Sequence, residues 1–297
     1  MRALYDLPAP AKLNLFLHIT GRRGDGYHLL QSAFMLIDWC DTLHVELRSD
    51  GGLSREDLTT ALPEDDLVLR AARALQPFAT PGQGAHIGVA KHVPAQAGMG
   101  GGSSDAATCL LALHRLWDLR LPLAQLEQIG LTLGADVPFF LRGHNAWVEG
   151  IGEEITPIAI EPARFAVVKP TEGLDTRHIF AADDLQRATP AAIISGFAAD
   201  DAAELGDSVR MPTDRQPQRP FEFGHNDLQP VAQRLCPPVS EAIEWLGAHG
   251  LAARMTGSGS AVFAAMPHDV LFADAPAGWQ VRKCSNLSVH PLAGWVG

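Results

Sequence analysis

The stretch Gly98-Met99-Gly100-Gly101-Gly102-Ser103-Ser104-Asp105 decides how this chain is interpreted. It lies between a strand-like segment and a segment with strong helical patterning. Glycine has no Cβ, so three consecutive glycines allow a sharp turn and a close approach of the backbone to a ligand. The two serines offer hydroxyls at a helix start, where unpaired N–H groups and the helix dipole favour an anion. We therefore predict a phosphate-binding loop at this junction.

The segment that follows the loop has its apolar residues at helical spacing: Ala106, Cys109, Leu110, Leu113, Leu116 and Trp117. This spacing predicts a helix with one apolar stripe. We expect Ser103 or Ser104 to cap the helix and Asp105 to complement its dipole from the first turn. The loop is not a P-loop, because no Gly-Lys-Ser/Thr ends it, and it lacks the spacing of a dinucleotide fingerprint. A plain glycine-rich turn is the alternative to a functional loop.

A second informative stretch is Pro10-Ala11-Lys12-Leu13-Asn14. From residue 12 to residue 20 apolar residues occupy alternate positions, which predicts a strand with one buried side. Lys12 and Asn14 lie on the other side, about 7 Å apart. A lysine on a strand is usually a solvated charge. Beside a phosphate loop, however, Lys12 can stabilise transferred charge and hold an aspartate ionised.

Two further turns carry polar groups that suit a reaction. In Leu133-Gly134-Ala135-Asp136-Val137-Pro138, the carboxylate stands two positions before a proline, at an expected helix start. Taken alone, Asp136 is more readily explained as an N-cap than as a group that accepts a proton from a substrate hydroxyl. The run Thr256-Gly257-Ser258-Gly259-Ser260 is a second turn of glycines and hydroxyls. It is a weak signal by itself, and we expect it to contribute to the same cleft as the first loop.

Hydrophobic patterning outlines the remaining elements. It predicts strands at residues 34–37, 42–47, 85–93 and 261–264, and helices at residues 65–78, 123–133 and 239–249. Tyr27 and His28 follow a glycine-rich turn and are expected in a loop. We place a domain boundary near residue 160, which gives domains 1–160 and 161–297. We assign no function to residues 181–224.

Composition excludes several classes of protein. The chain has 297 residues, of which 46% are hydrophobic and 19% charged, so it can bury a large core. Its net charge of -11 argues against nucleic acid or an anionic membrane as a partner, but allows a small anionic ligand. The four cysteines form no Cys-x-x-Cys pair and the 12 histidines show no metal-ligand spacing, so we expect neither a disulfide scaffold nor a metal site. We see no signal peptide and no membrane-spanning run, and expect a cytoplasmic protein. The sequence carries no signal of the oligomeric state.

Three regions, in this order along the chain, resemble the GHMP small-molecule kinase superfamily: Pro10 to Leu17, Pro94 to Ser104, and Thr256 to Ser260. The resemblance implies an α+β fold with two domains. The first domain would be similar to the second domain of ribosomal protein S5, and the second would be ferredoxin-like. The active site would lie in the cleft between them, with ATP as the phosphate donor and Mg²⁺ arriving with ATP.

Two stretches, Gly24 to His28 and Leu133 to Phe140, narrow the resemblance to certain members of the superfamily. Their acceptor is the 2-hydroxyl of 4-diphosphocytidyl-2-C-methyl-D-erythritol, in the non-mevalonate route to isoprenoid precursors. By this resemblance the catalytic residues are Lys12 and Asp136. Asp136 would orient or deprotonate the acceptor hydroxyl, and Lys12 would keep it ionised and neutralise the transferred phosphoryl group.

The resemblance also implies which residues bind the acceptor. Tyr27 and Phe180 would enclose its cytosine, an arrangement that suits a flat base. His28 would bind the edge of the cytosine by hydrogen bonds, and Asn14 would lie near the reacting groups. Thr176 belongs to the same short match as Phe180 and is assigned to substrate binding with it.

The nucleotide-binding residues implied by the resemblance form one continuous run: Pro94, Ala95, Gln96, Ala97, Gly98, Met99, Gly100, Gly101, Gly102, Ser103 and Ser104. Members of the superfamily usually have glycine where this chain has Gln96 and Ala97. If either residue needs a positive φ, its backbone is strained, because residues with a Cβ disfavour that region. We expect this departure to affect nucleotide affinity rather than the use of ATP.

Three other functions fit parts of the sequence. A related kinase for homoserine or a mevalonate-type alcohol has no use for Tyr27 and His28, because those substrates have no base to stack. A nucleotide-binding regulator without activity does not explain the presence of both Lys12 and Asp136. An RNA-binding module is suggested by the S5-like fold alone, and the acidic charge disfavours it.

Overall fold

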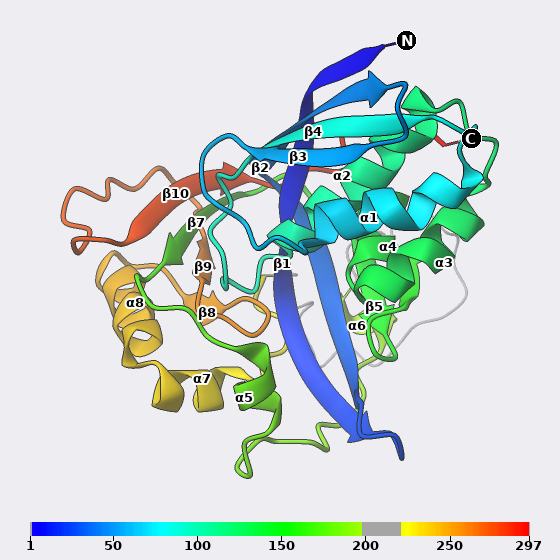
Figure 1. The fold of residues 1–297 in the computed structure, drawn as a ribbon. Helices are drawn as coiled ribbons and strands as arrows, with labels where there is room; N and C mark the ends of the chain where they lie inside the picture. Colours follow the sequence, from blue (N-terminus) through cyan, green and yellow to red (C-terminus); the bar gives the residue numbers. More distant parts are fainter. Residues whose placement is uncertain (1, 198–220, 297) are drawn as a thin grey trace, which may run out of the picture.

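The structure is a computed structural model that describes residues 2–197 and 221–296. Much of the stretch 181–224, to which the sequence assigned no function, therefore lies outside the described residues. The described chain forms two sheets (Figure 1). The first contains β1 to β6 and the second contains β7 to β10. Together with the helices, these sheets confirm the expected α+β architecture.

Two long strands dominate the first sheet. β1 (Ala3–Arg22) pairs antiparallel with β2 (His28–Arg48), and the pair extends across the molecule in Figure 1. β2 then pairs with β4 (Gly84–Ala90) and β5 (Ala146–Glu149), while β3 (Leu53–Asp57) and β6 (Glu154–Pro157) form the outer strands. The strands predicted separately at 34–37 and 42–47 are thus one strand. His28, expected in a loop, is its first residue.

β1 is buried on both faces, which corrects the expectation of a strand with one solvated side. Lys12 is 4% exposed and Asn14 is 2% exposed. The reason is that the second sheet shares two hydrophobic cores with this strand, and later segments of the chain also cover its second edge. The N–H of Lys12 donates to the carbonyl of Met99, and the N–H of Leu17 donates to the carbonyl of His225. Alternation of apolar residues along the sequence indicates one buried face of a strand, but it does not show which segments cover the opposite face.

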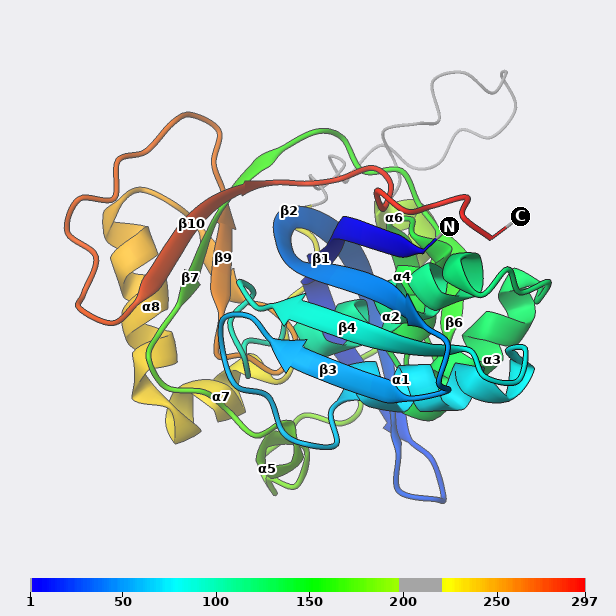
Figure 2. The same ribbon diagram turned by 45° about the horizontal axis from the view of Figure 1, so that its top comes forward.

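Helices cover one face of the first sheet (Figure 2): α1 (Leu67–Leu75), continued by η1 (Gln76–Phe78), α2 (Gly101–Leu116), α3 (Leu123–Leu133) and α4 (Val137–Arg142). The predicted stripe of α2 is buried in this core, and so are most of its other side chains. α2 is therefore a central helix, whose position is fixed by packing on several sides.

The start of α2 differs from the sequence expectation. Its N-cap is Gly100, whose φ of 70° is left-handed, and no side chain caps the helix. Ser103 and Ser104 lie inside the first turn instead, and the N–H of Ser104 donates to the carbonyl of Gly100. Asp105 forms an ion pair with Lys91. The glycine is preferred at the cap because this backbone conformation disfavours a Cβ.

The second sheet is antiparallel, in the order β10-β7-β9-β8. Its strands are β7 (Arg164–Lys169), β8 (Ala253–Met255), β9 (Val262–Ala265) and β10 (Gln280–Ser285). The helices α7 (Gln229–Leu235) and α8 (Pro237–Ala248) pack beside it, and α5 (Thr176–Phe180) and α6 (Ile194–Phe197) precede them. The connection from β9 to β10 contains no helix.

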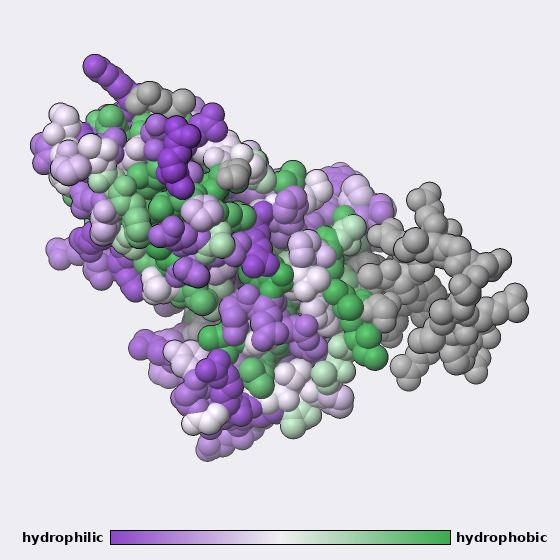
Figure 3. Space-filling view, turned by 90° about the vertical axis from the view of Figure 1, so that its right-hand side faces the viewer, coloured by the Kyte–Doolittle hydropathy of each residue, from purple (hydrophilic) through white to green (hydrophobic). Residues whose placement is uncertain are grey.

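The chain passes from the first sheet to the second between Pro157, where β6 ends, and Arg164, where β7 begins. The division into domains 1–160 and 161–297 remains a prediction, since residues after β10 return to the first sheet and Leu287 donates to Leu36. On the face shown in Figure 3, hydrophobic and hydrophilic residues are interspersed. None of the described helices is long and apolar enough to cross a membrane.

Candidate active site

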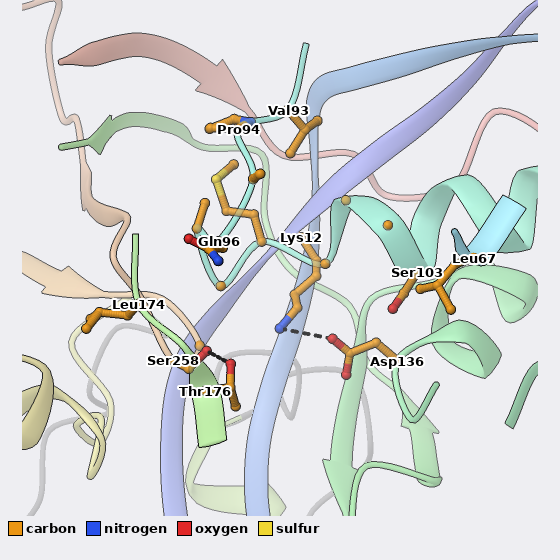
Figure 4. Close-up of a pocket in the computed structure, with 18 of the residues that line it drawn as sticks. Lys12, Leu67, Val93, Pro94, Gln96, Ser103, Asp136, Leu174, Thr176 and Ser258 are labelled. Atoms are coloured by element: carbon orange, nitrogen blue, oxygen red, sulfur yellow. Dashed lines mark hydrogen bonds and ion pairs between the residues drawn. The ribbon is translucent and has the colours of Figure 1, made fainter. Parts of the chain in front are cut away.

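A cavity of about 790 Å³ lies where the two sheets approach each other. The first sheet and its helices contribute Lys12, Asn14 and Asp136, and the loop contributes residues 93–103. The second half of the chain contributes Thr176, Phe180 and residues 257–259. Figure 4 shows side chains from all of these segments around one space. The structure therefore brings together the three regions that the sequence singled out.

Lys12 and Asp136 point toward each other in this cavity (Figure 4). The Nζ of Lys12 lies 3.5 Å from the Oδ2 of Asp136 and 4.4 Å from the centre of the Phe34 ring. Nζ also donates to the side-chain oxygen of Asn14. Burial lowers the pKa of Lys12, and Asp136 opposes this effect only in part. The ammonium is thus held in one place by a carboxylate, an amide and an aromatic ring.

Asp136 stands at the N-cap position of α4, but its side chain makes no capping hydrogen bond. Its side chain is 29% exposed, whereas that of Lys12 is 5% exposed. The carboxylate therefore faces the cavity and Lys12 rather than the helix. The N-cap interpretation fits the position of Asp136 in the chain but not the direction of its side chain.

The two glycine turns contact each other backbone to backbone. Gly98 has a φ of 70°, and a Cβ on it would lie 2.2 Å from the carbonyl oxygen of Thr256. Gly257 has a φ of 53°, and a Cβ there would lie 2.5 Å from the carbonyl oxygen of Gly98. Glycine at both positions is what allows this approach. The two turns were predicted to contribute to one cleft. The structure shows that they also contact each other directly.

Gln96, where glycine was expected, has a positive φ of 50°. Its carbonyl accepts a hydrogen bond from the N–H of Ser260, and its side chain packs against Gly173. The loop thus keeps a left-handed backbone at a residue that has a Cβ, which costs about 1–2 kcal/mol. Ala97 has an ordinary φ and accepts from the N–H of Ala261.

Asn14 connects the reacting end of the cavity to both turns. Its N–H donates to the hydroxyl of Thr256, 2.8 Å away, and its side-chain amide donates to Ser32. Its side-chain oxygen accepts from Lys12. Both polar atoms of this side chain therefore have partners in the protein. Asn14 orients the lysine, and it lines the cavity as expected.

Thr176 and Phe180 lie on α5, at the other end of the cavity. The hydroxyls of Thr176 and Ser258 are 2.6 Å apart (Figure 4). The ring of Phe180 packs on the ring of His28, with centroids 5.0 Å apart and planes tilted by 34°. Burial, and then the charges of Arg187 and Arg22, lower the pKa of His28. The imidazole is therefore neutral at neutral pH.

Three of the predicted residues do not line the cavity. Ser104 is fully buried in the first turn of α2. His28 reaches the site through its contact with Phe180. Tyr27 is 61% exposed, in the turn before β2, where its carbonyl accepts from the N–H of Arg23.

Sequence reasoning missed several residues around the cavity. Arg187 donates to the His28 ring and to the carbonyl groups of Phe180 and Ala182, so it joins β2 to α5. No motif marks it. Lys91 and Asp105 also line the cavity, as do residues 62–63 and 65–68 before and within α1. Of these, Asp66 had a signal, because an aspartate before a helical pattern is typical of an N-cap, and it caps α1.

Comparison with known families supports this description of the site. Residues 66–144 match the model of the N-terminal domain of GHMP kinases, and residues 194–273 match the model of their C-terminal domain. The first match contains the loop and Asp136, and the second contains the glycine turn at 256–260. The fold and these matches define an ATP-dependent small-molecule kinase of the GHMP family.

Comparison with individual proteins narrows the family further. The chain is 74% identical, over 100% of both chains, to 4-diphosphocytidyl-2-C-methyl-D-erythritol kinase of Variovorax paradoxus. A crystal structure of 4-(cytidine 5'-diphospho)-2C-methyl-D-erythritol kinase matches with 32% identity and a TM-score of 0.74, over 95% of this chain and 98% of that one. Homoserine kinase from Cytophaga hutchinsonii shares the fold, with a TM-score of 0.65 and 14% identity over 98% of this chain and 96% of that one. The chain belongs to the family of 4-diphosphocytidyl-2-C-methyl-D-erythritol kinases.

Replacing Gly98 tests the contact between the two turns. We expect Gly98→Ala to weaken nucleotide binding by about tenfold or more, because the new Cβ separates the loop from residues 256–259 and strains a left-handed residue. Binding of an ATP analogue, followed by calorimetry, measures the effect. Gly250→Ala is the matched control, since Gly250 also has a positive φ, of 75°, and no described atom lies within 4 Å of a Cβ there. Equal affinities of the two variants would contradict the described contact.

Proposed function

We propose that the protein transfers the γ-phosphate of ATP to the 2-hydroxyl of 4-diphosphocytidyl-2-C-methyl-D-erythritol, in the non-mevalonate route to isoprenoid precursors. The observation that carries the proposal is the Lys12–Asp136 pair, which faces a cavity lined by the glycine loop and by Phe180. The relatives named after this compound support the same acceptor.

The triphosphate would bind along the loop from residue 94 to residue 103. The N-terminus of α2 opens toward this loop, and unpaired N–H groups at a helix start favour an anion. Beside the loop, Leu62, Pro63, Leu67 and Val93 line the cavity with apolar surface that suits the adenine. The phosphates would then lie between the base and the Lys12–Asp136 pair.

Asp136 would accept the hydrogen bond of the acceptor hydroxyl and take its proton as the bond to phosphorus forms. Lys12 would neutralise the charge of the transferred phosphoryl group, because its side chain passes the start of α2, with Cε 3.2 Å from where a Cβ on Gly100 would lie. Phosphoryl transfer needs little covalent assistance, so positioning and charge are the main contributions of the protein.

Mg²⁺ would enter with ATP and neutralise charge on the phosphates. In the part of the chain that the structure describes, no three His, Cys, Asp or Glu side chains are grouped so as to hold a metal ion. Such a site suits an ion that keeps its waters and is bound chiefly by the substrate phosphates.

The cytosine would bind between α5 and the turn at residues 24–27. Phe180 offers one aromatic face at the cavity, and the neutral His28 ring stabilises Phe180 from behind. Tyr27, on the exposed turn, would close on the other face.

The release of ADP with Mg-ATP and each candidate alcohol tests the proposal. We expect turnover with 4-diphosphocytidyl-2-C-methyl-D-erythritol and none with homoserine or mevalonate, since neither alcohol carries a base for Phe180. Turnover with another alcohol would remove the cytosine site from the proposal. Binding of ATP without turnover of any of them would favour a nucleotide-binding regulator.

The role of Asp136 predicts a large loss of kcat in Asp136→Asn, by about 10²- to 10⁴-fold, because the amide cannot take the proton. The fold should be unchanged, since the side chain makes no capping hydrogen bond. Steady-state kinetics and thermal unfolding measure the two effects. Asp118→Asn, at a side chain 86% exposed, is the control. Near-normal kcat in Asp136→Asn would exclude Asp136 as the acceptor of the proton.

Closure of Tyr27 on the base predicts that Tyr27→Ala raises KM for the cytidine substrate by about threefold to tenfold, the equivalent of one stacking interaction. KM for ATP should stay within error. The other tyrosine of the chain, Tyr5, is 57% exposed and remote from the cavity residues, so Tyr5→Ala is the control. Equal changes in both KM values would argue against stacking by Tyr27.

A further inference from the structure

A buried ionic cluster lies beside the phosphate loop and has no role in the chemistry described above. The Nζ of Lys91 donates to the carboxylates of both Asp41 and Asp105, and lies 2.5 Å from Oδ2 of Asp105. Asp41 is completely buried, and Asp105 is 2% exposed. Asp41 belongs to β2, Lys91 follows β4, and Asp105 lies in α2. The cluster thus joins three elements around the loop.

Asp41 fixes the start of the loop through the backbone. Its Oδ1 accepts from the N–H of His92 at 2.5 Å and from the N–H of Val93 at 2.7 Å. The ring N–H of Trp39 donates to the carbonyl of His92. With two backbone bonds and Lys91, both oxygens of the Asp41 carboxylate have partners in the protein.

Asp105 has a different environment. Its Oδ2 accepts from Lys91, but its buried Oδ1 has no hydrogen-bond partner among the residues that the structure describes. Two carboxylates share one ammonium, so the cluster carries a net charge of -1 when both are ionised. Burial raises the pKa of Asp105 to about 7; the charge of Lys91 opposes this, and the neighbouring Asp41 reinforces it. Burial acts to lower the pKa of Lys91, but the two carboxylates outweigh it and keep the amine charged.

Because Asp105 lies beside the phosphate loop, its protonation changes the charge that a bound nucleotide would meet. Lys91 and Asp105 line the same cavity as residues 93–103. A triphosphate bound at this loop would lie near a cluster that already carries an excess negative charge. Protonation of Asp105 removes that excess, so the neutral form of the cluster binds an anion more strongly than the charged form.

We propose that binding of the nucleotide at the loop is linked to uptake of one proton by the Asp41–Lys91–Asp105 cluster, with Asp105 as the carboxyl that takes it. The proton comes from solvent or buffer and forms an O–H bond on Asp105, while Lys91 keeps its charge. Asp105 is a positioning residue in this scheme. The inference rests on the proposed binding of ATP at residues 94–103.

Other ionisable groups around Asp105 do not replace it in this role. Cys109, one turn further along α2, is buried, and burial raises the pKa of its thiol, so it stays protonated. Asp66, at the start of α1, forms an ion pair with Arg55, with 2.6 Å between nitrogen and oxygen. Arg55 also pairs with Asp57, and Asp66 caps α1, so the carboxylate of Asp66 is held by partners outside the cluster. Lys91 and Asp41 are the charges in direct contact with Asp105.

The sign of the pH dependence follows from this linkage. At a pH below the pKa of Asp105 the cluster is already neutral, and binding takes up no proton. As the pH rises through about 7, the free protein loses this proton and nucleotide affinity falls. If the bound nucleotide raises the pKa by one unit, the total loss of affinity is about tenfold.

The test compares the protein with Asp105→Asn, an isosteric variant that cannot titrate. Dissociation constants of a non-hydrolysable Mg-ATP analogue are measured from about pH 5.5 to about pH 8.5. We expect a fall in affinity of about threefold to tenfold in the protein and a flat profile in the variant. Protonation of the analogue's own phosphates also changes its affinity with pH, but this effect is the same for the protein and for the variant. Identical profiles would overturn the proposal, because a purely structural role of Asp105 changes affinity at all pH values alike.

A second measurement needs no variant. Calorimetry in two buffers of different ionisation enthalpy gives the number of protons taken up when the analogue binds. We expect uptake of a substantial fraction of one proton near pH 7.5 and none near pH 5.5. Absence of uptake at both values would overturn the proposal even if Asp105→Asn fails to fold. Failure of the analogue to bind at all would instead reject the proposed function.

Discussion

The site depends on one contact, the backbone-to-backbone approach of the loop at Gly98 to the turn at 256–259. β1 runs beside both, because Lys12 donates to the carbonyl of Met99 and the N–H of Asn14 donates to Thr256. One strand therefore sets the distance between the two turns and also carries the ammonium at the reacting end. A side chain at either glycine would separate these three segments together.

Burial gives the charged groups of the site their properties. Lys12 and Lys91 are both held by carboxylates in poorly solvated surroundings, but their partners differ in number. Lys12 has one carboxylate, which is partly open to solvent and free to meet a substrate. Lys91 has two, which are buried and bound to the fold. The first pair is suited to chemistry, and the second cluster is suited to holding the loop in position.

Much of this arrangement could be predicted from local sequence. The glycine loop, the stripe of α2 and the second glycine turn follow from residues close together in the sequence. The local motif around Asp136 favoured an N-cap, and the resemblance to GHMP kinases paired this carboxylate with Lys12, 3.5 Å away. The second edge of β1 could not be predicted, because residues more than 80 positions away cover it. The same holds for the hydrogen bonds of Arg187 and for Asp105, whose local pattern indicated a helix dipole rather than an ion pair. The domain limits and the roles of the site residues remain predictions.

The path of β1 also has a consequence for how the protein is made. Asn14 leaves the ribosome 242 residues before its partner Thr256. Until Thr256 is available, part of the second edge of β1 is uncovered and its apolar side chains are exposed. Both features favour pairing of this strand with the wrong segment of a growing chain. Such distant contacts also slow folding, because a long loop must close before they form. The active site is therefore expected to form only after the segment that contains Thr256 has been synthesised.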